Sequence, residues 1–304
     1  MCSFWSNNPC VPSWTDRIGM WWNSHPPKLV EPVKTNLMAQ TVQGCRIQKA
    51  TIQEAKLIEE FLGRYFSVSK SCRCVLPASF ISECIQDNSW EVYLVIRNSN
   101  QELVGTGVRK WLQNVHIKET FWQQAAIIDY FCVHPAYRKK GVGRWILTTL
   151  HNSAPSPLPP HFILWEGVQI KIPPIAPGLY YSKKRLAKKE ISCEKIQNPT
   201  FSFQGKDIWS SSGKYREVSF YKMPSGVISV WNTFHRSIPD GLAIGVVLSG
   251  SQRAIDEFSD SGPYGVLLAN YAVSEGWSVD SPYQWVSYNL SGGFLSTDYP
   301  CFCI

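Results

Sequence analysis

The segment FCVHPAYRKKGVGRWIL, residues 131–147, places three consecutive cations directly before a Gly-Val-Gly sequence. The glycines allow a tight or left-handed turn and let a ligand come close to the backbone. Amide groups at the start of a following helix attract an anion, and the cations add positive charge at the same place. The pattern predicts a strand, a glycine turn and a helix that together hold the phosphates of a small cofactor. The predicted phosphate-binding residues are Arg138, Lys139, Lys140, Gly141, Val142 and Gly143.

Two other interpretations of this segment stay open. A nucleic-acid surface would need only the positive charge, and the net charge of +7, from 30 Lys and Arg against 23 Asp and Glu, is small for 304 residues. We therefore predict no nucleic-acid partner. A basic helix start that binds no ligand is the second alternative. The segment is neither a P-loop, because Gly-Lys-Ser/Thr is missing, nor a G-x-G-x-x-G dinucleotide loop.

Few side chains near this segment can transfer protons. Asp129 is the only carboxylate in the apolar run before the turn, and it can act as a base, directly or through water, if burial raises its pKa. A purely structural carboxylate is the alternative. Glu166 is a second candidate base, and we interpret His134, which precedes a proline, as structural.

The elements that would position these residues follow a mixed helix and strand pattern. Thr51 and Glu54 form a capping box at the start of an amphipathic helix, and a second helix follows. A hairpin, a central strand buried on both faces, the glycine turn and a helix come next, which is typical of a layered α/β domain. The expected helices are 49–66, 77–88, the segment after Gly143 and 177–190, and the expected strands are 90–97, 102–112, 125–133, 161–170 and 216–224.

Three regions are expected along the chain. Residues 1–45, rich in Trp, Pro and Asn, form an extended arm, and residues 46–224 form the regular domain. Residues 225–304 form a shorter extension with helices at 251–260 and 262–277 and a strand at 283–290.

Composition limits the setting of the protein. The ten cysteines include no C-x-x-C pair, so we expect reduced thiols and no metal site. The N-terminus lacks a basic region followed by an apolar stretch, and no run approaches the ~20 apolar residues of a membrane span. We therefore expect a soluble, intracellular protein, located in the cytoplasm.

The motif VHPAYRKKGVG, residues 133–143, resembles the R-x-x-G-x-G pyrophosphate loop of the GNAT acyltransferase superfamily. A closer resemblance is to eukaryotic N-myristoyltransferases, which consist of two fused GNAT-like halves. WWNSHPPKL (21–29) is similar to the family's N-terminal arm, and IDYFCVH (128–134), LYYSKKRL (179–186) and FYKMP (220–224) are similar to later stretches, in order. The resemblance implies a GNAT-like α/β fold over residues 46–224 with a shortened C-terminal second half.

The resemblance also implies a function and its residues. It implies an acyl-CoA-dependent N-acyltransferase that uses myristoyl-CoA or acetyl-CoA and acylates an amine, with a peptide or protein N-terminus as a candidate acceptor. The backbone amides of Tyr130 and Phe131 would form the oxyanion hole. Transfer would be direct, because no nucleophile–base motif occurs. The other implied residues are Val133 with the phosphate loop, a cofactor cover of Trp21, Trp22 and Asn23, a proton donor at Tyr180, and the C-terminal carboxylate of Ile304 as base.

The sequence departs from the family in three ways, and two of them favour a second function class. Gly141 and Gly143 stand where the myristoyltransferases have a basic residue and alanine, and at these positions the chain is more similar to ordinary N-acetyltransferases. The segment RYFSVSK (64–70) has no carboxylate where the family has an acidic cluster for its peptide substrate. Because the second half is also short, a GNAT-derived binding or structural protein with partial or lost catalysis is the alternative.

Overall fold

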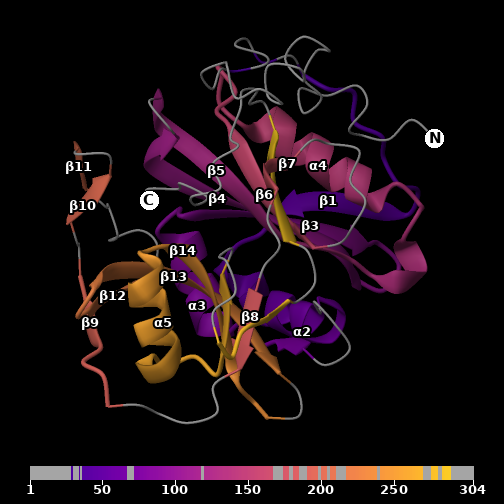
Figure 1. Ribbon diagram of the computed structural model, residues 1–304. Helices are drawn as coiled ribbons and strands as arrows, with labels where there is room; N and C mark the ends of the chain where they lie inside the picture. The colour runs from indigo at the N-terminus through magenta and orange to yellow at the C-terminus, as the bar shows by residue number, and fades with distance from the viewer. Residues whose placement is uncertain are drawn as a thin grey trace.

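The computed structural model describes most of the chain from residue 36 onward. Apart from one separate hairpin, its strands form two mixed sheets that lie against each other, one in the upper and one in the lower part of Figure 1. The described residues are 29, 34, 36–66, 72–117, 120–166, 174–177, 181–184, 190–197, 200–203, 206–209, 217–237, 240–269, 275–279 and 283–288.

The first sheet has seven strands in the order β1-β3-β4-β5-β6-β17-β7. Its centre is an antiparallel meander of β3, β4 and β5, joined by short turns, as the hairpin pattern predicts. A strand from near the end of the chain, β17, pairs antiparallel with both β6 and β7. The bounds are β1 Cys45–Lys49, β3 Trp90–Arg97, β4 Leu103–Ile117, β5 Thr120–Val133, β6 His161–Glu166, β7 Pro174–Pro177 and β17 Tyr283–Tyr288.

The central strand β5 diverges from its neighbour β6 after a short contact. The two strands run parallel and pair only at Ala126 with His161 and at Ile127 with Phe162. Beyond these pairs β6 continues in the sheet only through β17. The two central strands are therefore neighbours in the sheet that splay apart beyond Ile127.

Helices cover both faces of the first sheet (Figure 1). On one face, η2 and α2 begin with the predicted capping box of Thr51 and Glu54 and pack with α3 over a large apolar cluster. On the other face, α4 packs through Val142, Trp145 and Ile146. The bounds are η2 Ile52–Glu54, α2 Ala55–Tyr65, α3 Ala78–Gln86 and α4 Val142–Ser153.

The second sheet has the order β16-β8-β15-β14-β13-β12-β9, and β2 of the first half adds to β13. It contains its own parallel pair, β14 and β15, connected by α5, just as β5 and β6 are connected by α4. The second half therefore repeats the strand–helix–strand unit of the first. The bounds are β2 Cys72–Cys74, β8 Tyr181–Lys184, β9 Glu194–Ile196, β12 Val218–Met223, β13 Gly226–Ser237, β14 Ala243–Ser249, α5 Gln252–Ser261, β15 Val266–Ala269 and β16 Ser278–Val279, with a separate hairpin of β10 Thr200–Phe203 and β11 Lys206–Trp209.

Two predicted helices are wrong. In 177–190 the described part is the strand β8, and in 262–277 it includes the strand β15, which pairs with β8. The first segment is rich in helix-forming Lys and Leu, but pairing between strands overrides such local preferences. The apolar core of the second is the four residues VLLA, too short for its period to separate strand from helix.

The sheets do not divide the chain at residue 224. Strands β2, β8, β9 and β12 precede that residue but belong to the second sheet, whereas β17 follows it and belongs to the first. The two halves are interleaved through the sheets. The described residues contain no helix long and apolar enough to cross a membrane.

Two glycines of β4 bring α4 close to the first sheet. A Cβ atom at Gly105 would lie 2.7 Å from Val142 Cγ1, and one at Gly107 would lie 2.6 Å from Ile146 Cγ2. Both contacting atoms are branches on Cβ and cannot swing away as the end of a long side chain can. The short distance between α4 and β4 therefore depends on the absence of side chains at Gly105 and Gly107.

We expect Gly107→Ala to lower the free energy of unfolding by about 1–3 kcal/mol, because the added methyl overpacks the α4 interface. Gly63→Ala in α2 is the matched control, since its Cβ would lie 3.6 Å from Cys74 O, an ordinary contact, and alanine favours helix by up to about 1 kcal/mol. Denaturant unfolding of both variants checks this. Equal stability of the two variants would contradict the packing argument.

Candidate active site

The segment from His134 to Gly143, named the anion loop below, forms a compact turn between β5 and α4. It contains the short helix η3 Pro135–Tyr137, whose first turn is capped by His134 Nδ1 accepting from the Ala136 amide at 3.1 Å. The structural role predicted for His134 agrees with this bond. Lys139 and Gly141 take positive φ angles of 63° and 90°. Gly141 therefore supplies the left-handed turn that the sequence predicts.

The amides at the start of α4 are left without partners inside the helix. The first helical bond runs from the Trp145 amide to Gly141 O at 2.9 Å, so the amides of Val142, Gly143 and Arg144 have no acceptor in the helix. Gly141 has no side chain to cap them. In the second half, by contrast, the Ser251 hydroxyl accepts from the Ala254 amide at the start of α5. The uncapped helix start suits an anion.

The cations of the anion loop are exposed beside these amides. Arg138, Lys139 and Lys140 are all exposed, and Arg138 Nε donates to Val133 O at 3.2 Å. Lys140 lies over the Tyr137 ring, with Nζ 5.3 Å from its centroid. The structure thus brings the predicted phosphate-binding residues together in one turn.

The structure gives a different reason for glycine at position 143 from the close approach of a ligand that the sequence suggests. Its Cβ would lie 3.0 Å from Phe131 Cζ. Gly143 therefore lets the first turn of α4 pack on the ring of Phe131 in β5, while Gly141 makes the turn itself.

A buried arginine fixes the other end of α4 to the sheet. Arg109 of β4 donates to Leu150 O at 2.5 Å and to Ser153 Oγ at 2.8 Å, and it forms an ion pair with Glu91 of β3. Its guanidinium thus provides a donor for a carbonyl in the last turn of the helix, and its positive charge interacts favourably with the negative end of the helix dipole. Sequence reasoning missed Arg109, although a cation inside an apolar strand run is a signal for such an anchor.

The described part of the arm lies at the same end of α4. Lys34 Nζ donates to Asn152 O at 2.9 Å and to Ala154 O at 2.5 Å. The Asn152 side-chain amide accepts a hydrogen bond from the Leu37 amide and donates one to Leu37 O, at 2.8 Å each. The arm therefore continues along the helix that carries the anion loop.

A β-bulge in β5 lies beside the anion loop. The pairing with β4 shifts between Thr106, opposite Cys132, and Val108, opposite Asp129, so that Tyr130 and Phe131 together face Gly107. Tyr130 has a φ of 45°, which is rare for a residue with a side chain. These are the two residues whose amides the resemblance assigns to an oxyanion hole. In the structure the Tyr130 amide donates to Asp129 Oδ1 at 2.6 Å.

Next to the bulge, a buried ammonium connects the two sheets. Lys110 Nζ of β4 lies 2.5 Å from Asp129 Oδ2 and 2.6 Å from Glu217 Oε1. Glu217 is the residue just before β12. Three rings face the same ammonium, with centroids 4.9 Å away for Trp90, 4.4 Å for Tyr130 and 5.1 Å for Trp231. Lys110, Asp129 and Glu217 are named the charge cluster below.

Burial controls the protonation of the charge cluster. Burial raises the pKa of Glu217 from 4.5 to about 7, against the opposing effect of the Lys110 cation, and Asp129 raises it further. The carboxylates and their hydrogen bonds raise the pKa of Lys110, against the desolvation that lowers it, so its ammonium stays charged. Sequence reasoning missed Lys110 and Glu217. The consecutive Arg109 and Lys110 inside an apolar strand are the signal that could have found the first.

Several predicted site residues lie outside the described part of the chain. They are Trp21, Trp22, Asn23, Tyr180 and Ile304. Glu166 is described only as the last residue of β6. The roles given to these residues stay predictions, as does the oxyanion role of Tyr130 and Phe131.

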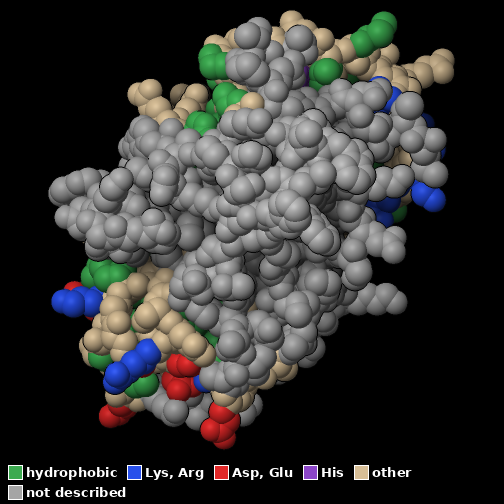
Figure 2. Space-filling model, turned by 45° about the horizontal axis from the view of Figure 1, so that its top comes forward, with side chains coloured by type: hydrophobic (Ala, Val, Ile, Leu, Met, Phe, Trp, Pro, Cys, Tyr) green, Lys and Arg blue, Asp and Glu red, His purple; other side chains and the backbone are tan. Residues whose placement is uncertain are grey.

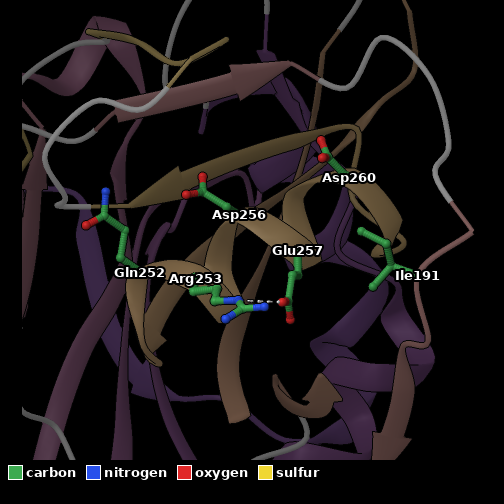
Figure 3. Close-up of a pocket in the computed structure, with 6 residues that line it drawn as sticks. All are labelled: Ile191, Gln252, Arg253, Asp256, Glu257 and Asp260. Carbon is green, nitrogen blue, oxygen red and sulfur yellow. Dashed lines mark ion pairs between the residues drawn. The ribbon is translucent and has the colours of Figure 1, made fainter. Parts of the chain in front are cut away.

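A shallow pocket of about 490 Å³ lies along α5 and contains none of these groups. Figure 3 shows its side chains, with Arg253 paired to Glu257 at 3.4 Å. The other acidic groups are also occupied, because Asp256 accepts from Trp277 Nε1 and Asp260 pairs with Lys183. In Figure 2 the visible acidic side chains gather at the lower end of the molecule, beside basic ones. We assign no site to this pocket.

Comparison with known proteins identifies the class of domain that carries the anion loop. Residues 57–156 match the family model described as acetyltransferase (GNAT) family, and this segment runs from α2 to the end of α4. This segment is therefore similar to a GNAT acetyltransferase domain. No curated protein matches the sequence.

The fold as a whole is similar to that of N-myristoyltransferase. The structure of the Saccharomyces cerevisiae enzyme with bound myristoyl-CoA matches with a TM-score of 0.65 and 10% identity, over 95% of this chain and 93% of that one. A second structure of that enzyme, with myristoyl-CoA and inhibitors, matches with a TM-score of 0.65 and 9% identity, over 96% and 90% of the two chains. The GNAT-like α/β fold with two mixed sheets is confirmed.

The charge cluster makes stability depend on pH. Because the folded-state pKa of Glu217 lies above its unfolded value of 4.5, its contribution to stability is full below about pH 4.5 and is lost as pH rises through about 7. We expect the stability difference between Glu217→Gln and wild type to shift in favour of the variant by on the order of 3 kcal/mol from pH 4.5 to pH 8. Denaturant unfolding across this range measures it.

Glu257→Gln is the matched control for this change. Glu257 is half-buried, and the hydrogen bond from the Ser225 hydroxyl lowers its pKa, so its effect on stability should not change above pH 5. Taking differences from wild type cancels the titration of His161 and His235, whose pKa values burial lowers to about 3 and about 4. A parallel pH dependence in Glu217→Gln and wild type would show that Glu217 stays ionised in the fold.

Proposed function

We propose that this protein is an acyl-CoA-dependent N-acyltransferase that transfers an acyl group from a CoA thioester to a primary amine. The uncapped start of α4 beside three exposed cations carries the proposal, because free helix amides and cations together suit the diphosphate of CoA. The GNAT domain match over the same residues supports acyl-CoA as the co-substrate. The likeness to N-myristoyltransferase makes a long-chain acyl group and a protein N-terminus our first choices, with cytoplasmic location as the expected setting.

The chemistry would use the bulge and the splayed strands. The pantetheine arm would enter where β5 leaves β6, and the thioester oxygen would accept from the amides of Tyr130 and Phe131. Hydrogen bonds to the developing oxyanion lower the barrier to attack by the amine. Asp129 remains our candidate base, because it lies beside the same amides.

One contact favours the alternative function. With its carboxylate on the Tyr130 amide, Asp129 occupies one of the two donors that the reaction needs. A protein that had lost catalysis could keep this contact permanently and still bind CoA. Binding and turnover are therefore separate questions.

CoA should stabilise the folded protein. A ligand that binds only the folded state at a hundredfold excess over its Kd adds about 2.7 kcal/mol, which raises the melting temperature by several degrees. Arg138→Glu should reduce the shift by adding repulsion, and Gly141→Val should reduce it by straining the left-handed turn at φ 90°. Thermal melting with CoA, repeated at high salt where screening weakens the shift, measures this.

Two comparisons make this test specific. Gly241→Ala is the control for strain, since Gly241 also has a positive φ but lies in a turn of the second half, so its variant should keep the full shift. Heparin should stabilise the protein less than CoA does. If heparin stabilises it equally and Gly141→Val binds CoA normally, the loop is only a basic surface.

Transfer should proceed without an acyl-enzyme. Burial raises the pKa of Cys74, Cys84 and Cys132 to about 12, so these thiols near the bulge stay protonated and poorly nucleophilic. We expect rapid-quench mass spectrometry with acyl-CoA to detect no acylated cysteine that forms and decays at the turnover rate. Detection of such a species would require a two-step mechanism.

A further inference from the structure

We infer that Lys110 is a positioning residue for the oxyanion donor: it holds the Asp129 carboxylate when a thioester oxygen takes over the Tyr130 amide. The inference rests on the proposed function, because it requires that amide to receive the acyl oxygen. It assigns a part in the reaction to a buried lysine that neither binds the phosphates nor exchanges the proton of the amine.

The two oxygens of Asp129 have different partners. Oδ1 accepts from the Tyr130 amide at 2.6 Å, and Oδ2 lies 2.5 Å from Lys110 Nζ. Rotation of the carboxylate can release the amide while the ion pair to Lys110 remains. Without Lys110 the displaced carboxylate would be a poorly compensated charge in a buried place, which is costly. Lys110 therefore makes the exchange of one oxygen for another feasible.

Glu217 changes how much of the Lys110 charge is available to Asp129. When Glu217 is ionised, two carboxylates share one ammonium and the charge cluster has a net charge of −1. That charge opposes a further negative oxygen on the Tyr130 amide. When Glu217 is protonated, Lys110 balances Asp129 alone, and an oxyanion can develop beside a neutral cluster.

Other titratable groups around the cluster stay neutral near pH 7. Burial raises the pKa of Cys74 in β2 and of Cys84 in α3 to about 12, and it raises that of Tyr130 in β5. Burial lowers the pKa of His235 in β13 to about 4. Glu217, whose pKa burial raises to about 7, therefore changes charge in the neutral range, and release of the amide should follow its protonation.

Two buried polar atoms beside the charge cluster could form new hydrogen bonds when its carboxylates move. Nε2 of His235 and the hydroxyl of Tyr130 have no hydrogen-bond partner of good geometry among the described residues, although the hydroxyl lies near enough to Glu217 to lower the pKa of that carboxyl. The Phe66 ring packs against both of their rings, at 5.5 Å from Tyr130 and 5.4 Å from His235. Polar groups thus remain available to respond when Asp129 or Glu217 moves.

The test compares CoA with an acyl-CoA ketone in which a methylene replaces the thioester sulfur. This ketone keeps a carbonyl oxygen at the thioester position and cannot transfer its acyl group. Calorimetry should show ketone affinity falling roughly fivefold or more between pH 6 and pH 8.5, beyond any fall for CoA itself. Glu217→Gln should remove this difference, and Lys110→Met should abolish the extra affinity for the ketone at both pH values. Glu60→Gln, at an exposed position of α2, should behave as wild type.

Nuclear magnetic resonance of tyrosine-¹⁵N protein gives a second readout on the wild-type protein, for which Tyr130→Phe serves only to assign the signal. The Tyr130 amide signal, assigned by its loss in Tyr130→Phe, should titrate near neutral pH and should move when the ketone binds but not when CoA binds. If the ketone binds without moving this signal, or if its affinity relative to CoA does not change with pH, the inference is wrong and the proposed function stands. If neither CoA nor the ketone binds, both are wrong.

Discussion

The buried ammonium of Lys110 is the interaction on which the relation between the two halves depends. It receives one carboxylate from each sheet, Asp129 from the first and Glu217 from the second, at 2.5 and 2.6 Å. Removing one partner of such a buried group typically costs about 3–5 kcal/mol, because the remaining charges lose their compensation. The geometry of the bulge therefore depends on the packing of the second half as well as on β5 itself.

The two halves share a strand–helix–strand unit but use it differently. In the first half the helix starts at an uncapped glycine beside three cations, and in the second it starts at Ser251, whose hydroxyl already satisfies an amide. The first half thus has the features of a ligand site, whereas the second supplies structure and the Glu217 carboxylate. Such a division is consistent with one cofactor site in a two-sheet molecule.

The anion loop could be predicted from sequence because each of its requirements is local. Glycine at 141 allows the positive φ of the turn, and the run before the turn has the composition of a buried strand. The start of η2 and α2 could be predicted for the same reason, because a local capping box marks it. The partners of Lys110 could not be predicted in this way. Glu217 follows it by 107 positions, and the antiparallel pairing of β2 with β13 spans a larger separation still, so no short pattern contains both partners.

The bulge shows a second limit of sequence reasoning. Its residues Asp129, Tyr130 and Phe131 read as ordinary members of an apolar strand, and the shift in register appears only against Gly107 of the neighbouring strand. The resemblance to a family pointed to these residues, whereas the contact between Asp129 and the Tyr130 amide depends on side-chain geometry that no resemblance specifies.

The place of β17 has a consequence for how the chain is made. This strand, residues Tyr283–Tyr288, lies between β6 and β7, so the first sheet is incomplete until the chain has left the ribosome as far as Tyr288. Until then β6 presents an unpaired edge, which can pair with other chains. A nascent or truncated molecule that already has its anion loop would therefore be prone to aggregate, and helper proteins that shield open strand edges would matter more for its synthesis than the local order of its helices suggests.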